Sequence, residues 1–297
     1  MSHTLDLYFE PALRRDRVLQ YFAGRKYFKI AEDKLSYGNP DTGVYFWIQL
    51  RCARNIFLQR TVASAEFEIN YNRPSFFGIE GERELSAFIA AFQPRIEDAQ
   101  MHGMGEGPYS RDGFLSGWNF GNVFAVHNRL SDVSAGDIPS LPADALRAAW
   151  TWNDQRADLK LRKAGCVVPT IRFLRMDGRL HRVAIWGDGA AIVLPQVDYV
   201  LVGKLTASEK RVALVPWSEI LEVAKRARFD TSKNPLSLAY LVTPQPIADW
   251  LATIPWIDFE ALPGDRFEAY EVLDDEVIAA ARELRTEVID PTTFERQ

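Results

Sequence analysis

The residues most able to do chemistry lie in a glycine-containing loop, DAQMHGMGEGPYS, from Asp98 to Ser110. Asp98 precedes His102 by one helical turn's length, and a carboxylate beside an imidazole is a common way to build a general base. The pair supports one hypothesis, a hydrolase-type enzyme with a dispersed site. It stays an alternative, because the chain has no G-x-S-x-G nucleophile motif to accompany it.

Metal and phosphate sites have little support in the sequence. The other histidines, His3, His127 and His181, have no partner at the spacing of a zinc site. The chain lacks an H-E-x-x-H motif and a G-x-x-x-x-G-K-[ST] phosphate loop. The glycines of GMGEG precede no basic residue that could hold a phosphate and follow no clear parallel strand. We therefore predict no metal, no cofactor and no catalytic residue.

Carboxylates cluster at two places, as one pair and one triplet, and each group has an ordinary structural interpretation. Glu66 and Glu68 alternate with apolar residues in AEFEINY, which predicts that both lie on the solvent face of a strand. Service as an acid/base pair would require a burial that this alternation argues against. Asp274, Asp275 and Glu276 begin a predicted helix, where capping explains them without a metal.

Binding is the chemistry that remains, because aromatic and arginine residues are enriched at interface hot spots. The segment NYNRPSFFGIEGERELSAF places Arg73, Phe76 and Phe77 in what resembles a turn. Pro74 restricts Arg73 to extended geometry, so the strand is expected to end there. We expect the next helix to begin near Gly81. One phenylalanine would join strand and helix, and the other would remain available to a partner.

The elements that must position these residues follow from local patterns. In the first half, strands are predicted at 4–10, 44–52 and 65–71, and helices from about 11, over 81–92 and over 112–128. In the second half, we predict a helix over 142–163, a hairpin turning at Asp177-Gly178, strands at 198–205, 210–217 and 236–242, and helices over 218–227, 247–252 and 274–287.

The sum is an α+β fold of mostly antiparallel sheets with packed helices, in two similar-sized halves. The turn-forming residues of 131–144 predict a linker between them. The predicted organisation is an N-terminal α+β domain over 1–130, the linker over 131–144 and a C-terminal α+β domain over 145–297.

The composition bounds the function. The chain has 297 residues, 47% of them hydrophobic and 25% charged, as in an ordinary globular protein. A net charge of -5 argues against a nucleic-acid partner, which normally requires a basic face. Two distant cysteines favour a reducing compartment. No signal peptide and no apolar run of about 20 residues is found, so we expect no membrane association and a cytoplasmic location.

The charge is unevenly distributed. Basic residues prevail over 147–182, and acidic residues prevail over 258–290. One hypothesis is that these regions attract each other or form solvated faces. The other is that the acidic region steers a basic partner toward the protein.

Three stretches, YGNPDTGVYFWIQL, FEINYNRPSFFGIEGERELSAFI and SGWNFGNVFAV, together resemble bacterial immunity proteins. These are antidotes encoded beside secreted antibacterial toxins such as type VI secretion effectors. The resemblance extends over about Leu5 to Val126, and the segment from Asp198 to Leu221 is similar in character.

This resemblance implies a cytoplasmic, non-enzymatic protein that binds a cognate secreted toxin and inhibits it by contact. A nuclease would suit an acidic inhibitor, because nucleases are often basic. A non-catalytic regulatory binding module is a further alternative. The candidate partner-binding residues are Glu66, Glu68, Arg73, Phe76, Asp258, Glu260, Glu268 and Glu271.

Overall fold

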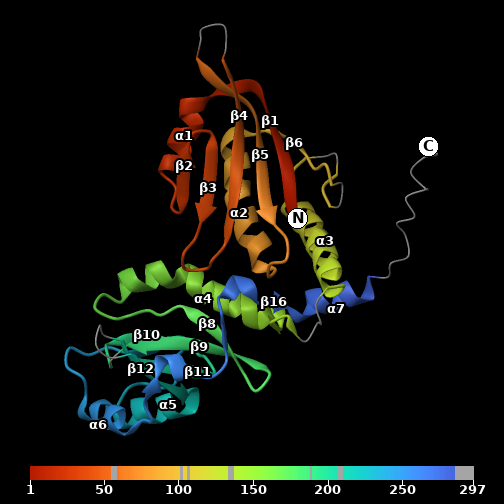
Figure 1. Cartoon of the computed structure of the whole chain (residues 1–297). Helices are drawn as coiled ribbons and strands as arrows, with labels where there is room; N and C mark the ends of the chain where they lie inside the picture. The colour runs from red at the N-terminus through yellow and green to blue at the C-terminus, as the bar shows by residue number, and fades with distance from the viewer. Residues whose placement is uncertain are drawn as a thin grey trace. The chain divides into compact units, whose positions relative to one another are not determined.

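The computed structural model describes residues 1–54, 59–100, 103–105, 108–132, 137–187, 189–205 and 210–284. The predicted α+β fold with mostly antiparallel sheets is confirmed. The chain forms two compact units, shown in Figure 1. The first comprises Met1–Ala143 together with the chain from Tyr270 onward, and the second comprises Asp144–Ala269.

A six-stranded sheet organises the first unit, in the order β2-β3-β4-β5-β1-β6 with every neighbouring pair antiparallel. The strands are β1 (Ser2–Arg14), β2 (Phe28–Ala31), β3 (Lys34–Gly38), β4 (Tyr45–Arg54), β5 (Arg60–Asn70) and β6 (Arg95–Glu97). β1 is longer than predicted, so the first helix begins at Arg15 instead of about Pro11.

The helices of the first unit are α1 (Arg15–Ala23), α2 (Phe76–Phe92), α3 (Arg111–Leu130) and α7 (Asp275–Glu283). They build a core rich in aromatic residues. Phe88 of α2 lies 5.1 Å from Phe22 of α1, measured between ring centroids. Phe114 of α3 lies 5.8 Å from Phe67 on the buried face of β5. Large rings in tilted or edge contacts supply much of the buried apolar area.

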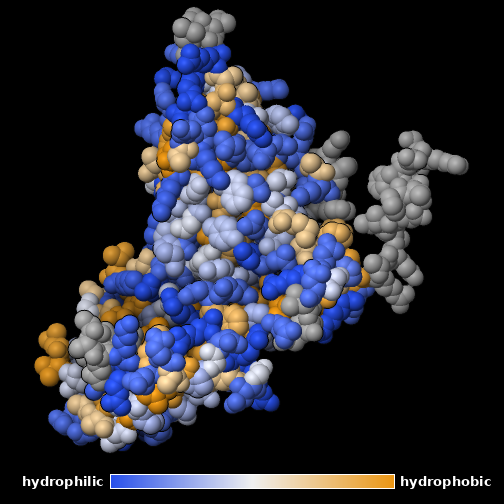
Figure 2. Space-filling model, in the orientation of Figure 1, coloured by the Kyte–Doolittle hydropathy of each residue, from blue (hydrophilic) through white to orange (hydrophobic). Residues whose placement is uncertain are grey.

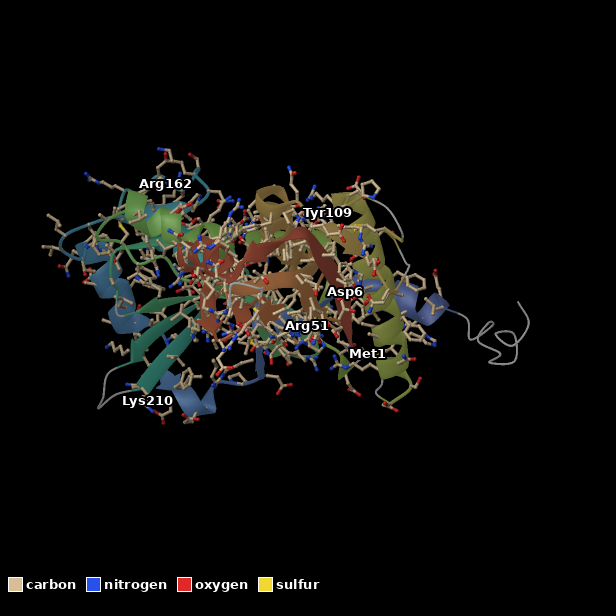
Figure 3. The ribbon with its side chains drawn as sticks, turned by 90° about the horizontal axis from the view of Figure 1, so that it is seen from above. Met1, Asp6, Arg51, Tyr109, Arg162 and Lys210 are labelled. Atoms are coloured by element: carbon tan, nitrogen blue, oxygen red, sulfur yellow. The ribbon has the colours of Figure 1, made fainter. Side chains whose placement is uncertain are left out.

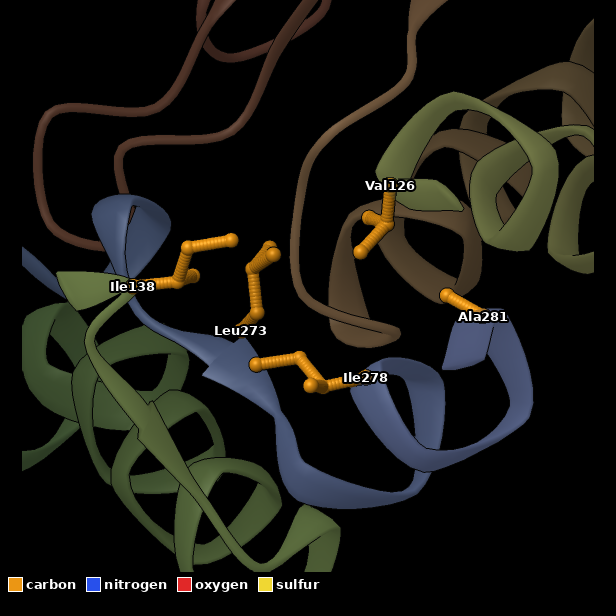
Figure 4. Packing of buried hydrophobic residues seen from close by; sticks show 5 residues of the cluster. All are labelled: Val126, Ile138, Leu273, Ile278 and Ala281. Carbon is orange, nitrogen blue, oxygen red and sulfur yellow. The ribbon is translucent and has the colours of Figure 1, made fainter. Parts of the chain in front are cut away.

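The C-terminal part of the chain completes the first unit. β16 (Leu273–Asp274) pairs in parallel with β7 (Ser140–Leu141). Figure 4 shows the apolar cluster that forms around this pair and α7. Its buried members are Val126, Ile138, Leu273, Ile278 and Ala281. The predicted C-terminal domain, 145–297, therefore differs from the second unit in its last part, which packs with residues of the first unit.

The second unit has its own six-stranded sheet, in the order β14-β12-β11-β9-β8-β15, in which only the β9–β11 pair is parallel. The strands are β8 (Ile171–Met176), β9 (Arg179–Gly187), β11 (Tyr199–Leu205), β12 (Lys210–Pro216), β14 (Ile257–Asp258) and β15 (Asp265–Phe267), and a separate pair is formed by β10 (Ile192–Leu194) and β13 (Leu236–Leu238). The helices are α4 (Ala143–Arg162), α5 (Trp217–Arg226) and α6 (Gln245–Thr253).

The predicted hairpin of the second unit is confirmed. Met176 pairs with Arg179 across the turn, and both Asp177 and Gly178 have positive φ angles, as a tight two-residue turn requires. The strand predicted over 236–242 is too long, because β13 ends at Leu238. Leu241 and Val242 beyond it are fully and largely exposed, respectively.

Candidate interaction surface

The sheet of the first unit has one buried face and one outward face. Along β1, Leu5 and Leu7 are completely buried, whereas Asp6 and Tyr8 between and after them remain accessible. Helices α1, α2 and α3 pack on the buried face, and within the described residues of this unit no helix covers the outward one. Figure 2 shows this side of the unit as mainly hydrophilic and near-neutral residues. We call it the outward face.

A row of carboxylates crosses three neighbouring strands of the outward face. Asp6 of β1 stands directly opposite Glu66 of β5 on one side and opposite Glu97 of β6 on the other. Directly opposed side chains in antiparallel strands have Cβ atoms about 5 Å apart, and like charges at that spacing repel each other. We call Glu97, Asp6 and Glu66 the acidic row.

The acidic row is only partly neutralised by the chain itself. Arg51 Nη2 donates to Glu66 Oε2 at 2.8 Å, and Arg95 Nη1 donates to Glu97 Oε1 at 2.5 Å. Asp6 forms no side-chain hydrogen bond or ion pair within the described residues. Burial, followed by the charges of Glu66 and Glu97, raises the pKa of Asp6, and the positive charge of Arg51 partly opposes that shift. Figure 3 labels Asp6 and Arg51 in this unit.

Aromatic side chains flank the acidic row on the same face. The Lys34 ammonium lies 4.7 Å from the centroid of the Trp47 ring, and the Arg95 guanidinium lies 4.6 Å from that of Tyr8. Both distances are within the range of cation–π attraction. The outward face therefore already holds cations against its aromatic rings.

Glu68, predicted with Glu66 to face outward, does so and is held on both of its oxygens. Ser2 Oγ donates to Oε1 at 2.8 Å, and Trp47 Nε1 donates to Oε2 at 2.8 Å. Glu68 therefore shapes the outward face and orients Trp47, whereas Glu66 carries charge within the acidic row.

Arg73 and Phe76, the other predicted partner-binding residues of the first unit, have different surroundings. Arg73 Nη2 donates to Tyr45 Oη at 2.7 Å. Burial raises the pKa of Tyr45, but hydrogen bonds from Arg73 and Asn70 outweigh it and bring the pKa below its ordinary value. Phe76 is 1% exposed, so its ring belongs to the core.

The segment from Arg73 to Gly81 is therefore not the extended turn that the sequence predicts. α2 begins at Phe76 rather than near Gly81, and Phe77 is also completely buried. The expectation that one phenylalanine stays available to a partner is wrong, because the helical geometry turns both rings inward.

The acidic residues predicted near the C-terminus are distributed over both units. Asp258, Glu260 and Glu268 belong to the second unit, whereas Glu271 belongs to the first. Asp258, Glu260 and Glu271 are exposed. Glu268 Oε1 lies 3.0 Å from Arg172 Nη1, so one contact does join the basic and acidic regions of the sequence.

Of the predicted enzymatic pair, Asp98 and His102, the histidine lies outside the described residues. Asp98 is 4% exposed and accepts a hydrogen bond from the Gln100 amide at 3.1 Å. Its neighbour is His3, completely buried, whose Nδ1 lies 3.2 Å from Tyr71 Oη. Burial lowers the pKa of His3, although the charge of Asp98 opposes the shift. These groups are enclosed in the core.

Two buried carboxylates that sequence reasoning did not single out have structural roles in α2. Glu80 Oε1 accepts hydrogen bonds from Tyr37, Asn39 and Thr42 at 2.7, 2.8 and 3.1 Å. Buried charges of this kind require such donors. The donors come from the turn YGNPDTG, so Glu80 fixes the connection between β3 and β4 to α2.

Glu82, two residues along α2, is held by a second set of donors. It accepts from Tyr109 Oη at 2.9 Å and also from Ser86 Oγ, and Arg111 Nε lies 3.3 Å from its other oxygen. Tyr109 lies on the helix side of the sheet, away from the acidic row, as Figure 3 shows. Neither glutamate reaches the outward face.

The described residues contain no group of three or more His, Cys, Asp or Glu side chains arranged to hold a metal ion. Among the same residues, no helix combines the length and apolarity needed to cross a bilayer. Comparisons of the chain with family models, with curated proteins and with solved structures found no match.

Proposed function

We propose that this chain is an immunity protein that binds a secreted bacterial toxin in the cytoplasm and inhibits it by contact. The observation that carries the proposal is the outward face, where the acidic row lies beside half-buried aromatic rings on a sheet that no helix of the described first unit covers. Aromatic anchors combined with charges that complement a partner are typical of protein interfaces.

The sequence resemblance to immunity proteins supports the same function. The stretches that carry it contribute to β4, the end of β5, α2 and α3, and they include Trp47 and Glu68 of the outward face. A basic toxin such as a nuclease would complement the acidic row, because nucleases carry positive charge for their own substrate. A hydrolase built on Asp98 has weaker support, since that carboxylate is only 4% exposed.

The test is co-expression with the product of the neighbouring gene. We expect the two proteins to co-purify and the chain to restore growth of cells that express that product as a toxin. An unrelated protein of similar size and charge serves as the control. Binding without restored growth would favour a regulatory module, and the absence of binding would exclude the proposed function.

A further inference from the structure

We infer that the segment 98–100 is a pH-sensitive clasp over the start of β1, and that protonation of the buried His3 opens it. The clasp consists of the contacts through which this segment holds Ser2 and Thr4. The device lies within the first unit and requires no partner, so it does not depend on the proposed function.

The clasp continues the edge of the first sheet beyond its last strand. β6 pairs with β1 and ends directly before the segment (Figure 1). Gln100 then bonds to β1 on both sides of His3. Its Nε2 donates to the carbonyl of Ser2 at 3.0 Å, and its Oε1 accepts from the N–H of Thr4 at 3.3 Å. The N–H of Gln100 donates in turn to Asp98 Oδ1 at 3.1 Å. A single side chain therefore holds the backbone before and after the histidine.

The clasp encloses His3 without a full set of hydrogen-bond partners. His3 is completely buried, its Nδ1 lies 3.2 Å from Tyr71 Oη, and its Nε2 has no partner within the described residues. Asp98 is buried as well, and its Oδ2 also lacks a partner in this part of the chain. A neutral imidazole is buried at less cost than an imidazolium, which carries a charge and needs an acceptor for each of its two N–H groups.

The groups that face His3 determine how it responds to pH. Burial lowers the pKa of His3, and the charge of Asp98 and the side chain of Gln100 oppose this shift without cancelling it. Burial and then Asp98 raise the pKa of Tyr71 to about 12, so its hydroxyl stays neutral near neutral pH. α3 contributes the uncharged ring of Phe114, 5.3 Å away between centroids, and the residue of β5 opposite His3 is apolar. Asp98 is therefore the charged group that acts on His3 among the described residues.

These surroundings give the pH response a definite direction. With the clasp open, His3 is solvated and takes up a proton near its ordinary pKa of 6.5, whereas in the closed clasp it does so only at lower pH. The open form therefore binds more protons below pH 6.5, and acidification favours it. Uptake of one proton raises the ratio of open to closed forms by at most about tenfold per pH unit. Well above pH 6.5 the ratio does not change.

The test is amide hydrogen exchange of the full chain, followed by NMR at about pH 7 and about pH 5 and expressed as protection factors. We expect protection of the Thr4 and Gln100 amides to fall about tenfold at the lower pH, and that of β11 and β12 to change less than about twofold. His3→Asn keeps a polar group toward Tyr71 but cannot be protonated, so it should abolish the fall. His181→Asn removes a half-buried imidazole from the second unit and is the matched control, which should retain it.

A fall in protection that persists in His3→Asn would overturn the inference, as would equal protection at the two pH values in the wild type. The NMR titration of the His3 ring in the wild type keeps the test valid if His3→Asn folds poorly, and a pKa of 6.5 or above would also contradict the clasp. Asp98→Asn removes the opposing charge and should lower the pKa of His3 further and enlarge the loss of protection. A raised pKa of His3 in that variant would count against the mechanism.

Discussion

At the scale of single residues, the first unit treats its carboxylates in two contrasting ways. Glu80 is completely buried and is met by three donors, which offset the cost of burying a charge. Asp6 is accessible, faces two other carboxylates and has no donor within the described residues. The first arrangement serves folding. The second sets like charges opposite one another, an arrangement that destabilises an antiparallel sheet.

Replacing Asp6 with Asn should stabilise the protein at neutral pH. The pKa of Asp6 is raised in the folded state, so its ionised form costs stability above that pKa, and the cost disappears once the pH falls below the ordinary Asp value of about 4. We expect Asp6→Asn to gain about 0.5 kcal/mol at pH 7, a small value because the site is solvated, and nothing at pH 3.

Urea unfolding at both pH values measures the difference. Asp158→Asn, at an exposed position in α4, is the control and should change little at either pH. A loss of stability in Asp6→Asn at pH 7 would show that the three carboxylates of the acidic row do not repel one another.

Much of the outward face could be predicted from the sequence, but the acidic row could not. The alternation in AEFEINY correctly placed Glu66 and Glu68 on one face of a strand. The row appears only when β1 lies between β5 and β6, and that order depends on contacts between distant parts of the chain. Local periodicity carries no information about which strands become neighbours.

At the scale of elements, α2 begins at Phe76, five residues before the start near Gly81 that the sequence predicts. The stretch FFGIEG contains two glycines, which weaken a helix by about 1 kcal/mol each. The structure needs them small, because a Cβ on Gly78 would lie 2.7 Å from the Trp118 ring and one on Gly81 would lie 2.6 Å from Ile69. Close packing between elements therefore extends the helix through residues whose intrinsic preference opposes it.

The beginning of α2 is also fixed by a residue far away in sequence. Asp274 accepts hydrogen bonds from the backbone N–H of Ser75 at 2.6 Å and from its hydroxyl at 2.8 Å. Ser75 precedes the first residue of the helix, where a carboxylate also interacts favourably with the helix dipole. Asp274 does occupy the N-cap position of α7, as predicted, but its side chain makes no capping hydrogen bond to that helix and bonds Ser75 at the start of α2 instead.

Removing this contact should destabilise the protein substantially. Asp274→Ala removes the acceptor of the part-buried N–H and hydroxyl of Ser75, and we expect a loss of about 2 kcal/mol in the free energy of unfolding. Asp275→Ala, at the adjacent exposed position, should cost much less. Urea denaturation of both variants provides the comparison, and equal losses would show that the helix start does not depend on Asp274.

At the scale of the whole molecule, the sequence predicts two consecutive domains, whereas the first unit is built from two separate stretches of the chain. A linker over 131–144 was predicted, and the first unit does give way to the second after Ala143. The chain then returns to the first unit at Tyr270, through β16 and α7. Turn-forming residues mark where a chain can leave a domain, but a return is decided by long-range packing such as that around Leu273 and Ile278.

Because α7 packs in the first unit, a core substitution in α7 should destabilise that unit rather than the second. Ile278→Ala removes buried apolar volume from the cluster in Figure 4 and should cost about 2 to 4 kcal/mol. Its effect should appear as faster amide hydrogen exchange in α3 and β7, while β11 and β12 of the second unit remain unchanged. Val212→Ala, in the core of the second unit, should produce the converse pattern. If Ile278→Ala instead accelerated exchange mainly within Asp144–Ala269, α7 would have to be assigned to the second unit, as the order of the sequence had suggested.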